Sequence, residues 1–284
     1  MGELYATALK RLSPAGARRL RDDERKWLAF LDQKCPQTPP PTDDARRCLS
    51  NAYSDRVADL RLTAIRQGPF LFTRSDTYVA IKVEPDPDDK AAVPDMGSVH
   101  NSVPQIDWPT SATTTAWNRV VMHGDLDTDC ESGGDNAQDY QLGLVTSRLI
   151  SVTWSDWEYC HGTPHGHGGS HAQNLVLAPD WRPLTPADLF RSDRPWKQTL
   201  RKLLLAAVEK AGRDPDTGGI DLEKLDLSTI DEVDGDPKRW SLRKAGLGVA
   251  FDPYELGEGY PFAPDVTIPW SALKGVLVRD PTAP

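Results

Sequence analysis

The chain has 284 residues, a formal net charge of −9, 38% hydrophobic residues and nine tryptophans. This apolar content excludes a disordered chain and is enough for one large or two ordinary domains. The acidic balance disfavours nucleic acid or an anionic membrane surface as a partner, because phosphates are bound by clustered Lys and Arg. No run approaches the roughly 18 apolar residues that a membrane span needs, so we expect a soluble protein.

The N-terminal residues predict three helices, of which the second and third form an antiparallel hairpin. Residues 4–12 keep a helical apolar spacing, and Ser13 and Thr42 are suited to cap the two helices that follow. A proline-rich link, PQTPPPT, separates those two helices. Since Cys35 and Cys48 flank this link, we expect a disulfide worth roughly 3 kcal/mol from loop closure. The alternative is a pair of reduced, buried thiols.

Two phrases in this segment support a family resemblance. The first is L-x-x-x-x-R-x-W-L-x-F-x-D-x-x-C, formed by Leu20, Arg25, Trp27, Leu28, Phe30, Asp32 and Cys35. The second is C-L-x-x-x-x-x-x-R-x-x-x-L, formed by Cys48, Leu49, Arg56 and Leu60. Over residues 1–66 the chain resembles the helical two-cysteine domain of LprI-type bacterial envelope proteins. That resemblance implies an exported protein, and the namesake of the family is a lysozyme inhibitor. The usual family sequence lacks the proline-rich insert.

The periodicity changes from helical to alternating after Gln67-Gly68-Pro69, which predicts domains at residues 1–68 and 69–284. Residues 78–83 read as a strand, and residues 84–105 as a Pro- and Asp-rich loop without an apolar face. Residues 117–122 are predicted to form another short strand.

An acidic turn follows this strand and offers a weak calcium site. Its candidate ligands alternate like the first positions of an EF-hand loop: Asp125, Asp127, Asp129 and Glu131. The match then fails, because Cys130 stands where the loop needs glycine and Asn136 stands where the bidentate Glu belongs. A solvated acidic turn is the alternative, and we expect no bound cofactor.

The stretch Ser151–Leu177 contains a histidine-rich tract between two predicted strands, residues 142–155 and 172–177. Glycines are interleaved with the imidazoles there, so the backbone can turn tightly. Cys160 with the histidines suggests zinc, but structural sites usually pair their ligands as CxxC or HxxxH, and here HxxxH occurs once, at His161 and His165, in a glycine-rich context. We therefore expect a surface loop that binds a partner, with the donors His161, His165, His167, Ser170 and His171. Cys130 and Cys160 are left for each other if Cys35 pairs with Cys48, although four cysteines allow three pairings.

The C-terminal part is predicted to combine a long helix with further strands. Thr185 begins a short helical turn with a capping-box pattern, and a helix over residues 195–211 carries a buried face. Residues 213–238 read as an acidic loop, and strands are expected at residues 240–251 and 266–269. The turn between these strands supplies a second candidate binding surface through the aromatic residues Tyr254, Tyr260 and Phe262.

Several phrases in this half occur in the order of a second known family. They are Y-x-x-C-H-G-x-x-H-G, L-x-P-x-D-L-F, F-D-P-Y-E-L-G and V-x-I-P-W. The positions are Tyr159, Cys160, His161, Gly162, His165, Gly166, Leu184, Pro186, Asp188, Leu189, Phe190, Phe251 to Gly257, Val266, Ile268, Pro269 and Trp270. Residues 70–278 are thereby similar to the extracellular domain of RsiV-type anti-sigma factors, which binds lysozyme. The resemblance implies an α+β fold with an antiparallel sheet packed on the long helix, following the disulfide-stapled helical hairpin. His167 and His171 are additions to the family phrase.

Together these features predict a bacterial envelope protein that binds and inhibits a lysozyme-like muramidase, either a host lysozyme or a peptidoglycan-hydrolase toxin against which it confers immunity. We expect an exported or periplasmic protein, whose leader or lipoprotein anchor precedes these residues. The chain carries none of the common catalytic motifs, and we expect no enzyme. A hydrolase built from Asp156 or Glu158 with His165 is the enzymatic alternative. A cell-wall or ligand-sensing module without inhibitory activity is the other.

Overall fold

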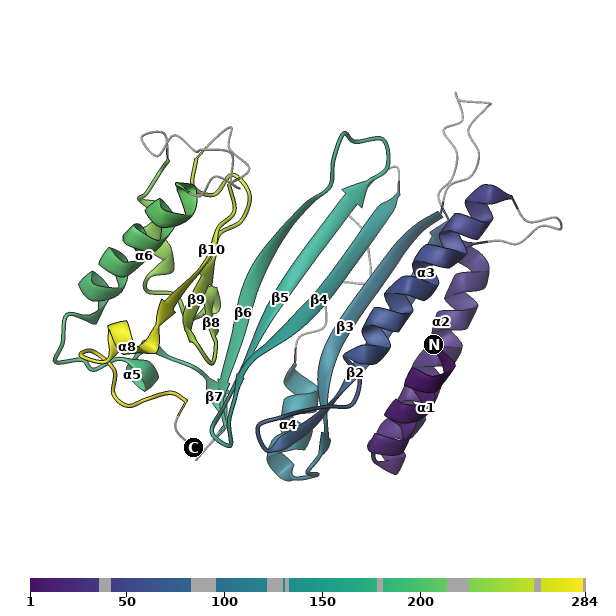
Figure 1. Cartoon of the computed structure of the whole chain (residues 1–284), viewed down its shortest axis with the longest axis horizontal. Coiled ribbons are helices and arrows are strands. Elements are labelled where there is room, and N and C mark those ends of the chain that lie inside the picture. Colours follow the sequence, from purple (N-terminus) through teal and green to yellow (C-terminus); the bar gives the residue numbers. More distant parts are fainter. Residues whose placement is uncertain are drawn as a thin grey trace. The chain divides into compact units, whose positions relative to one another are not determined.

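The computed structural model describes residues 1–35, 42–82, 96–121, 130, 133–177, 181–213, 225–257 and 262–282 (Figure 1). The chain forms two compact units. Unit 1 comprises Met1–Asp139 and Asp156–His167, and unit 2 comprises Tyr140–Ser155 and Gly168–Pro284. Each unit combines helices with strands, which confirms the predicted α+β class. The predicted boundary at residue 68 rests on periodicity and stays a prediction.

Three helices begin unit 1: α1 (Gly2–Arg11), α2 (Pro14–Lys34) and α3 (Asp43–Arg61). Both predicted caps are present, since the Ser13 hydroxyl accepts from the Gly16 N–H and the Thr42 hydroxyl from the Ala45 N–H, each at 3.1 Å. A disulfide joins Cys35 at the end of α2 to Cys48 in α3. The expected stapled hairpin is thus confirmed.

Seven strands form the larger sheet, in the order β1-β2-β3-β4-β5-β6-β7. β2 pairs antiparallel with β1 and β3, whereas β3 and β4 run parallel. β4, β5 and β6 each contain residues of both units. The strand bounds are β1 Ile65–Gln67, β2 Phe70–Lys82, β3 Met96–Trp108, β4 Gly134–Val145, β5 Leu149–Cys160, β6 His167–Val176 and β7 Arg182–Pro183.

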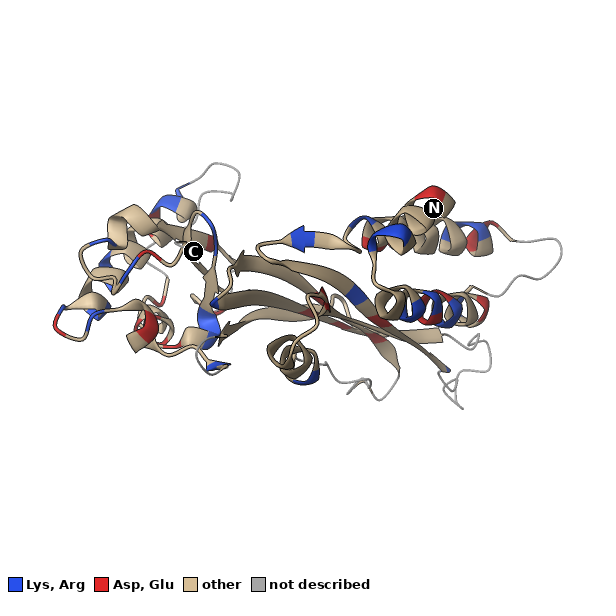
Figure 2. Cartoon of the chain, turned by 90° about the horizontal axis from the view of Figure 1, so that it is seen from below, with Lys and Arg blue, Asp and Glu red and all other residues tan. Residues whose placement is uncertain are grey.

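Within unit 1, helices cover both faces of β2 and β3. α2 packs against β2, while α4 (Ala112–Val120) packs against β3 from the other face (Figure 2). The start of α2 is tied to β3 by the buried Asp107, which accepts from the Ser13 N–H and hydroxyl, each at 2.6 Å. A Cβ at Gly16 would lie 2.2 Å from this carboxylate, so only glycine permits the approach.

The structure corrects two predictions for residues 84–122. Residues 96–105, expected in a loop, belong to β3; they lack apolar alternation because Asn101, Ser102 and Gln105 are buried polar side chains. Residues 117–120, expected in a strand, are helical. Ser111 and Thr114 form a reciprocal capping box at the start of α4, and this local chemistry outweighs the β-branched composition.

Unit 2 contains the smaller sheet, in the order β10-β9-β8, with α6 (Trp196–Gly212) packed against β10. This agrees with the prediction of an antiparallel sheet on a long helix. Its strands are β8 Trp240–Leu242, β9 Gly246–Ala250 and β10 Asp265–Pro269, and its short helices are α5 Pro186–Leu189, α7 Thr229–Val233 and α8 Trp270–Leu273. The core of unit 2 is apolar and includes Leu200, Leu204, Val208, Leu242, Leu247 and Val249.

Residues 240–251, predicted as one strand, form the hairpin β8–β9. Arg243 and Gly246 exchange backbone hydrogen bonds across its turn. A Cβ at Gly246 would lie 2.1 Å from the Ile268 carbonyl oxygen, so glycine allows β10 to pair alongside. Residues 213–238, predicted as a loop, include α7.

Two disulfides, Cys35–Cys48 and Cys130–Cys160, pair all four cysteines. The pairing that follows when Cys35 bonds to Cys48 is therefore the one present. Such bonds fit an oxidising compartment. Among the helices in the described part of the chain, none has the length and apolar character to cross a membrane.

Candidate partner-binding hairpin

The connection between β5 and β6 in unit 1 is an exposed hairpin with a fixed base. Cys160, the last residue of β5, bonds to Cys130, and the His161 N–H donates to the Gly133 carbonyl at 3.0 Å. The turn itself is tight, because Thr163 donates through both its N–H and its hydroxyl to the Cys160 carbonyl. Gly162, at φ +89°, supplies the left-handed backbone that the turn needs. We call residues 157–167 the hairpin.

An aromatic ladder lies along one face of the hairpin. Trp157 and Tyr159 in β5 and His161 directly after it occupy alternate positions, so their side chains share one face. The rings of Trp157 and Tyr159 stack at 6.1 Å between centroids, and those of Tyr159 and His161 lie 5.8 Å apart. A Cβ at Gly166 would lie 2.9 Å from the Trp157 ring, which therefore packs directly on the glycine backbone. Trp157 remains 47% exposed, and so presents a large, restrained apolar surface to solvent.

His161 is oriented by a charged cluster beside the ladder. Its Nε2 lies 3.2 Å from Asp135 Oδ2, and Asp135 also accepts from Lys34 at 2.8 Å and from the Ser98 hydroxyl. Burial acts to raise the pKa of Asp135, but the hydrogen bonds from Lys34, Ser98 and His161 outweigh it and hold the pKa below its usual value. The carboxylate therefore stays ionised and fixes the imidazole at the edge of the ladder.

The other two predicted histidines of unit 1 lie at the turn and just after it. His165 is exposed, with Nδ1 3.1 Å from the Gly166 carbonyl oxygen. His167 is the first residue of β6, and its Nε2 lies 3.3 Å from Glu158 Oε2. The tract expected as a loop over residues 161–171 is thus a short turn followed by a strand.

The remaining predicted binding residues lie in unit 2, apart from Tyr260, which is outside the described residues. Ser170 donates its N–H to Asp252 at 2.8 Å, and His171 stacks on Trp154. Tyr254 is 50% exposed at φ +68°, whereas the Phe262 ring is buried in the core. Of the predicted set, the hairpin brings together His161, His165 and His167. The calcium candidates Asp125, Asp127, Asp129 and Glu131 also lie outside the described residues.

Sequence reasoning missed a buried charge cluster between α2, α3 and the sheet of unit 1. Arg56 donates to Glu24 at 2.8 Å and to Asp76 at 2.8 Å, and Arg74 donates to Asp76 at 2.8 Å. Both guanidinium groups and Asp76 are almost completely buried. The i, i+2 spacing of Arg74, Asp76 and Tyr78 was the available signal, since it places three polar side chains on one face of a strand.

This cluster also contains the grouping best placed to hold a metal among the described residues. Ligand atoms of Asp59, Asp76 and His100 lie within 4.8 Å of one another. Burial acts to raise the pKa of Asp76, but His100, Arg74 and Arg56 outweigh it, so its pKa lies well below the usual value. Since two guanidinium groups already neutralise these carboxylates, the donor set does not fit a divalent cation.

Comparisons with known proteins find solved structures that are similar to this chain, but no curated relative. No protein-family model matches the sequence, and neither does any curated protein. A DUF3298 family protein from Pseudomonas aeruginosa PAO1 is 13% identical with a TM-score of 0.44, covering 75% of this chain and 96% of its own. A DUF3298 family member from Bacteroides fragilis NCTC 9343 is 14% identical with a TM-score of 0.49, covering 76% of this chain and 97% of its own.

Proposed function

We propose that this chain is an exported binding protein that inhibits a lysozyme-like muramidase, with the hairpin as its contact surface. The observation that carries the proposal is Trp157, an exposed tryptophan on the β5 strand of a hairpin that a disulfide at Cys160 anchors. Interface hot spots are enriched in tryptophan, and a restrained side chain loses little conformational entropy on binding. The LprI-type and RsiV-type sequence resemblances supply the class of partner.

The chemistry of the hairpin suits a muramidase groove. Such enzymes hold two carboxyl groups in an open cleft. A hairpin that carries aromatic rings and imidazole donors is able to fill this cleft and hydrogen-bond the acids. The net charge of −9 favours encounter with a basic partner, and most secreted muramidases are basic. In this proposal the chain performs no catalysis of its own.

The test is the lysis of a peptidoglycan suspension by muramidase, with and without this protein. The panel contains an animal c-type lysozyme and a bacterial muramidase toxin, which separates a host-lysozyme inhibitor from an immunity protein. We expect inhibition of one class, and Trp157→Ala to raise the inhibition constant by about 30-fold or more, as for a hot spot worth about 2 kcal/mol. The matched control is Trp108→Ala, since Trp108 is equally exposed in unit 1 and lies against Arg66 instead.

Three other results would contradict the proposal or its contact surface. Retention by insoluble peptidoglycan without inhibition of either enzyme would replace the proposal with a cell-wall-binding module. Release of soluble glycan fragments by the protein alone would show that the protein is an enzyme and not an inhibitor. Equal inhibition by the Trp157→Ala and wild-type proteins would remove the hairpin from the contact surface.

A further inference from the structure

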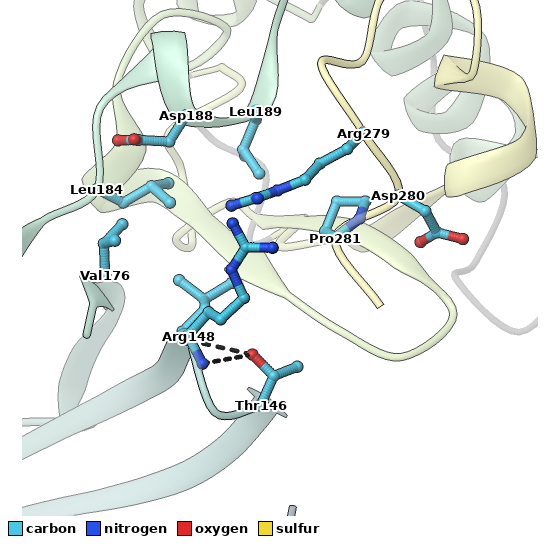
Figure 3. A pocket seen from close by; sticks show the side chains of 10 residues that line it. Thr146, Arg148, Val176, Leu184, Asp188, Leu189, Arg279, Asp280 and Pro281 are labelled. Atoms are coloured by element: carbon cyan, nitrogen blue, oxygen red, sulfur yellow. Dashed lines mark hydrogen bonds between the residues drawn. The ribbon is translucent and has the colours of Figure 1, made fainter. Parts of the chain in front are cut away.

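A pocket in unit 2 is lined by apolar side chains on one side and by two arginines on the other. It lies where the β4–β5 turn meets α5 and the C-terminal segment, and Leu149, Leu184, Leu189 and Pro281 form its apolar side. Arg148 from the turn and Arg279 from the C-terminal segment supply the polar side, and Figure 3 shows their guanidinium groups next to each other. The pocket residues belong to unit 2 and the hairpin to unit 1, and a role for the pocket does not depend on the proposed inhibitor function.

These two arginines are exceptional in their unit. Seven of the nine arginines of unit 2 form an ion pair with a carboxylate. Arg148 and Arg279 have no acidic partner within the described residues, although they lie side by side. Two neighbouring cations repel each other, so an anion between them would relieve the repulsion.

The two carboxylates that line the pocket are already engaged. Asp188 accepts from both terminal nitrogens of Arg182, at 2.7 and 2.6 Å. The hydrogen bonds from Arg182 are the largest of the causes that lower the pKa of Asp188 to about 2. The Asp188 carboxylate is therefore ionised at neutral pH, and the charge of Arg182 compensates it. Asp280 accepts from the N–H and the hydroxyl of Thr282. Neither carboxylate satisfies Arg148 or Arg279.

The backbone holds both arginines in place. The Arg148 N–H donates to the Thr146 hydroxyl at 3.1 Å, which fixes the turn. Next to Arg279, the Val278 N–H donates to the Leu189 carbonyl at 2.8 Å, and Leu277 bridges to Phe190. A site whose backbone is already fixed pays less conformational entropy when a ligand binds.

We propose that this pocket binds the carboxylate of a short aliphatic group, such as the free C-terminus of a peptide ending in alanine. The planar forks of two guanidinium groups match a carboxylate with charge-assisted hydrogen bonds. The leucine and proline side chains beside them suit a methyl-sized aliphatic group, because its transfer from water to an apolar surface is favourable. A protein C-terminus and a peptidoglycan stem peptide share this chemistry but differ in the chirality of the alanine.

The experiment is an NMR titration that follows the Arg Nε–Hε signals of the whole chain, assigned with the variants Arg148→Gln and Arg279→Gln. The probes are N-acetyl-L-Ala-L-Ala, N-acetyl-D-Ala-D-Ala, the C-terminal amide of each, and inorganic phosphate. We expect at least one free acid to shift both signals, and its amide to bind about tenfold more weakly or worse, because a charge-assisted hydrogen bond is lost. Whichever free acid binds tighter identifies the source of the carboxylate.

The variants then test the two arginines separately. Each of Arg148→Gln and Arg279→Gln should weaken the better acid about tenfold or more. The control Arg201→Gln, which removes an exposed arginine paired with Asp231 in the same unit, should leave binding unchanged. Should a variant fail to fold, the comparison of acid with amide on the wild-type chain still decides the matter. Equal behaviour of acid and amide, or tighter binding of phosphate than of either acid, would overturn the proposal.

Discussion

The two units place their helices on their sheets by different physical means. In unit 1, α2 and α3 meet the larger sheet through Arg56, Arg74 and Asp76, which are almost fully buried. In unit 2, α6 meets the smaller sheet through apolar side chains such as Leu204 and Val249, both with no exposed surface. Among the described residues of unit 2, Asp234 is the one buried ionisable side chain. One chain thus combines an ionic interface with an apolar one.

The difference matters because the two kinds of interface respond to different perturbations. A buried ion pair contributes little net stability over an apolar pair, yet removing one partner leaves an uncompensated charge in the interior. An apolar interface loses stability in proportion to the cavity that a truncation creates. The ionic interface should therefore depend on pH, and the apolar one should not.

The largest expected effect comes from breaking the ionic interface with Arg56→Ala. This change removes the cation that Glu24 and Asp76 share, and we expect a loss of about 3–5 kcal/mol in the free energy of unfolding. Urea unfolding at neutral pH measures it. Arg25→Ala, which removes an exposed arginine of α2, is the control and should cost under about 1 kcal/mol. A cost for Arg56→Ala as small as that of the control would mean that the cluster contributes nothing specific.

The matching change in the apolar interface is Leu204→Ala. Because Leu204 is completely buried in the core of unit 2, we expect a loss of about 3 kcal/mol. The same loss should appear at pH 5 and pH 8, since no ionisable group changes. Leu205→Ala, at a half-buried position of the same helix, should cost less. A strong pH dependence of the Leu204→Ala effect would contradict the division between the two interfaces.

The smallest effect, and the sharpest test of pH dependence, comes from Asp23 in α2. Burial, reinforced by the charge of Asp76, raises the pKa of Asp23 from 3.8 to about 6. The folded state therefore holds this proton more tightly than the unfolded state, so its contribution to stability is complete below about pH 4 and is lost as the pH rises through about 6. Asp23→Asn cannot lose a proton, and should be more stable than the wild type at pH 7 by up to about 3 kcal/mol.

Urea unfolding between pH 4 and pH 7 measures this difference, which should shrink towards zero at the acidic end. Asp32→Asn, at an exposed position of the same helix, is the control and should show no such trend. A difference that is constant across this range would show that Asp23 does not titrate as described.

Local features were predictable because their partners are close in the sequence. Ser13 and Thr42 cap helices through N–H groups three residues away, and Cys35 and Cys48 flank a short link. β3 was missed because its buried side chains include Asn101 and Ser102, which no hydrophobic pattern reports. For the hairpin, the glycine and histidine content indicated an exposed turn, while the stacking of Trp157 on Tyr159 was not anticipated.

The sequence by itself determined the α+β class, the helical caps and the disulfide that joins α2 to α3. Each of these depends on contacts within a short stretch of chain. Only the tertiary structure decided which charges are buried and which arginines have no carboxylate partner among the described residues. Arg56 and Asp76 come from a helix and a strand, and Arg148 and Arg279 from opposite ends of unit 2. The state of a charged side chain depends on its neighbours in space, and distant segments supply those neighbours.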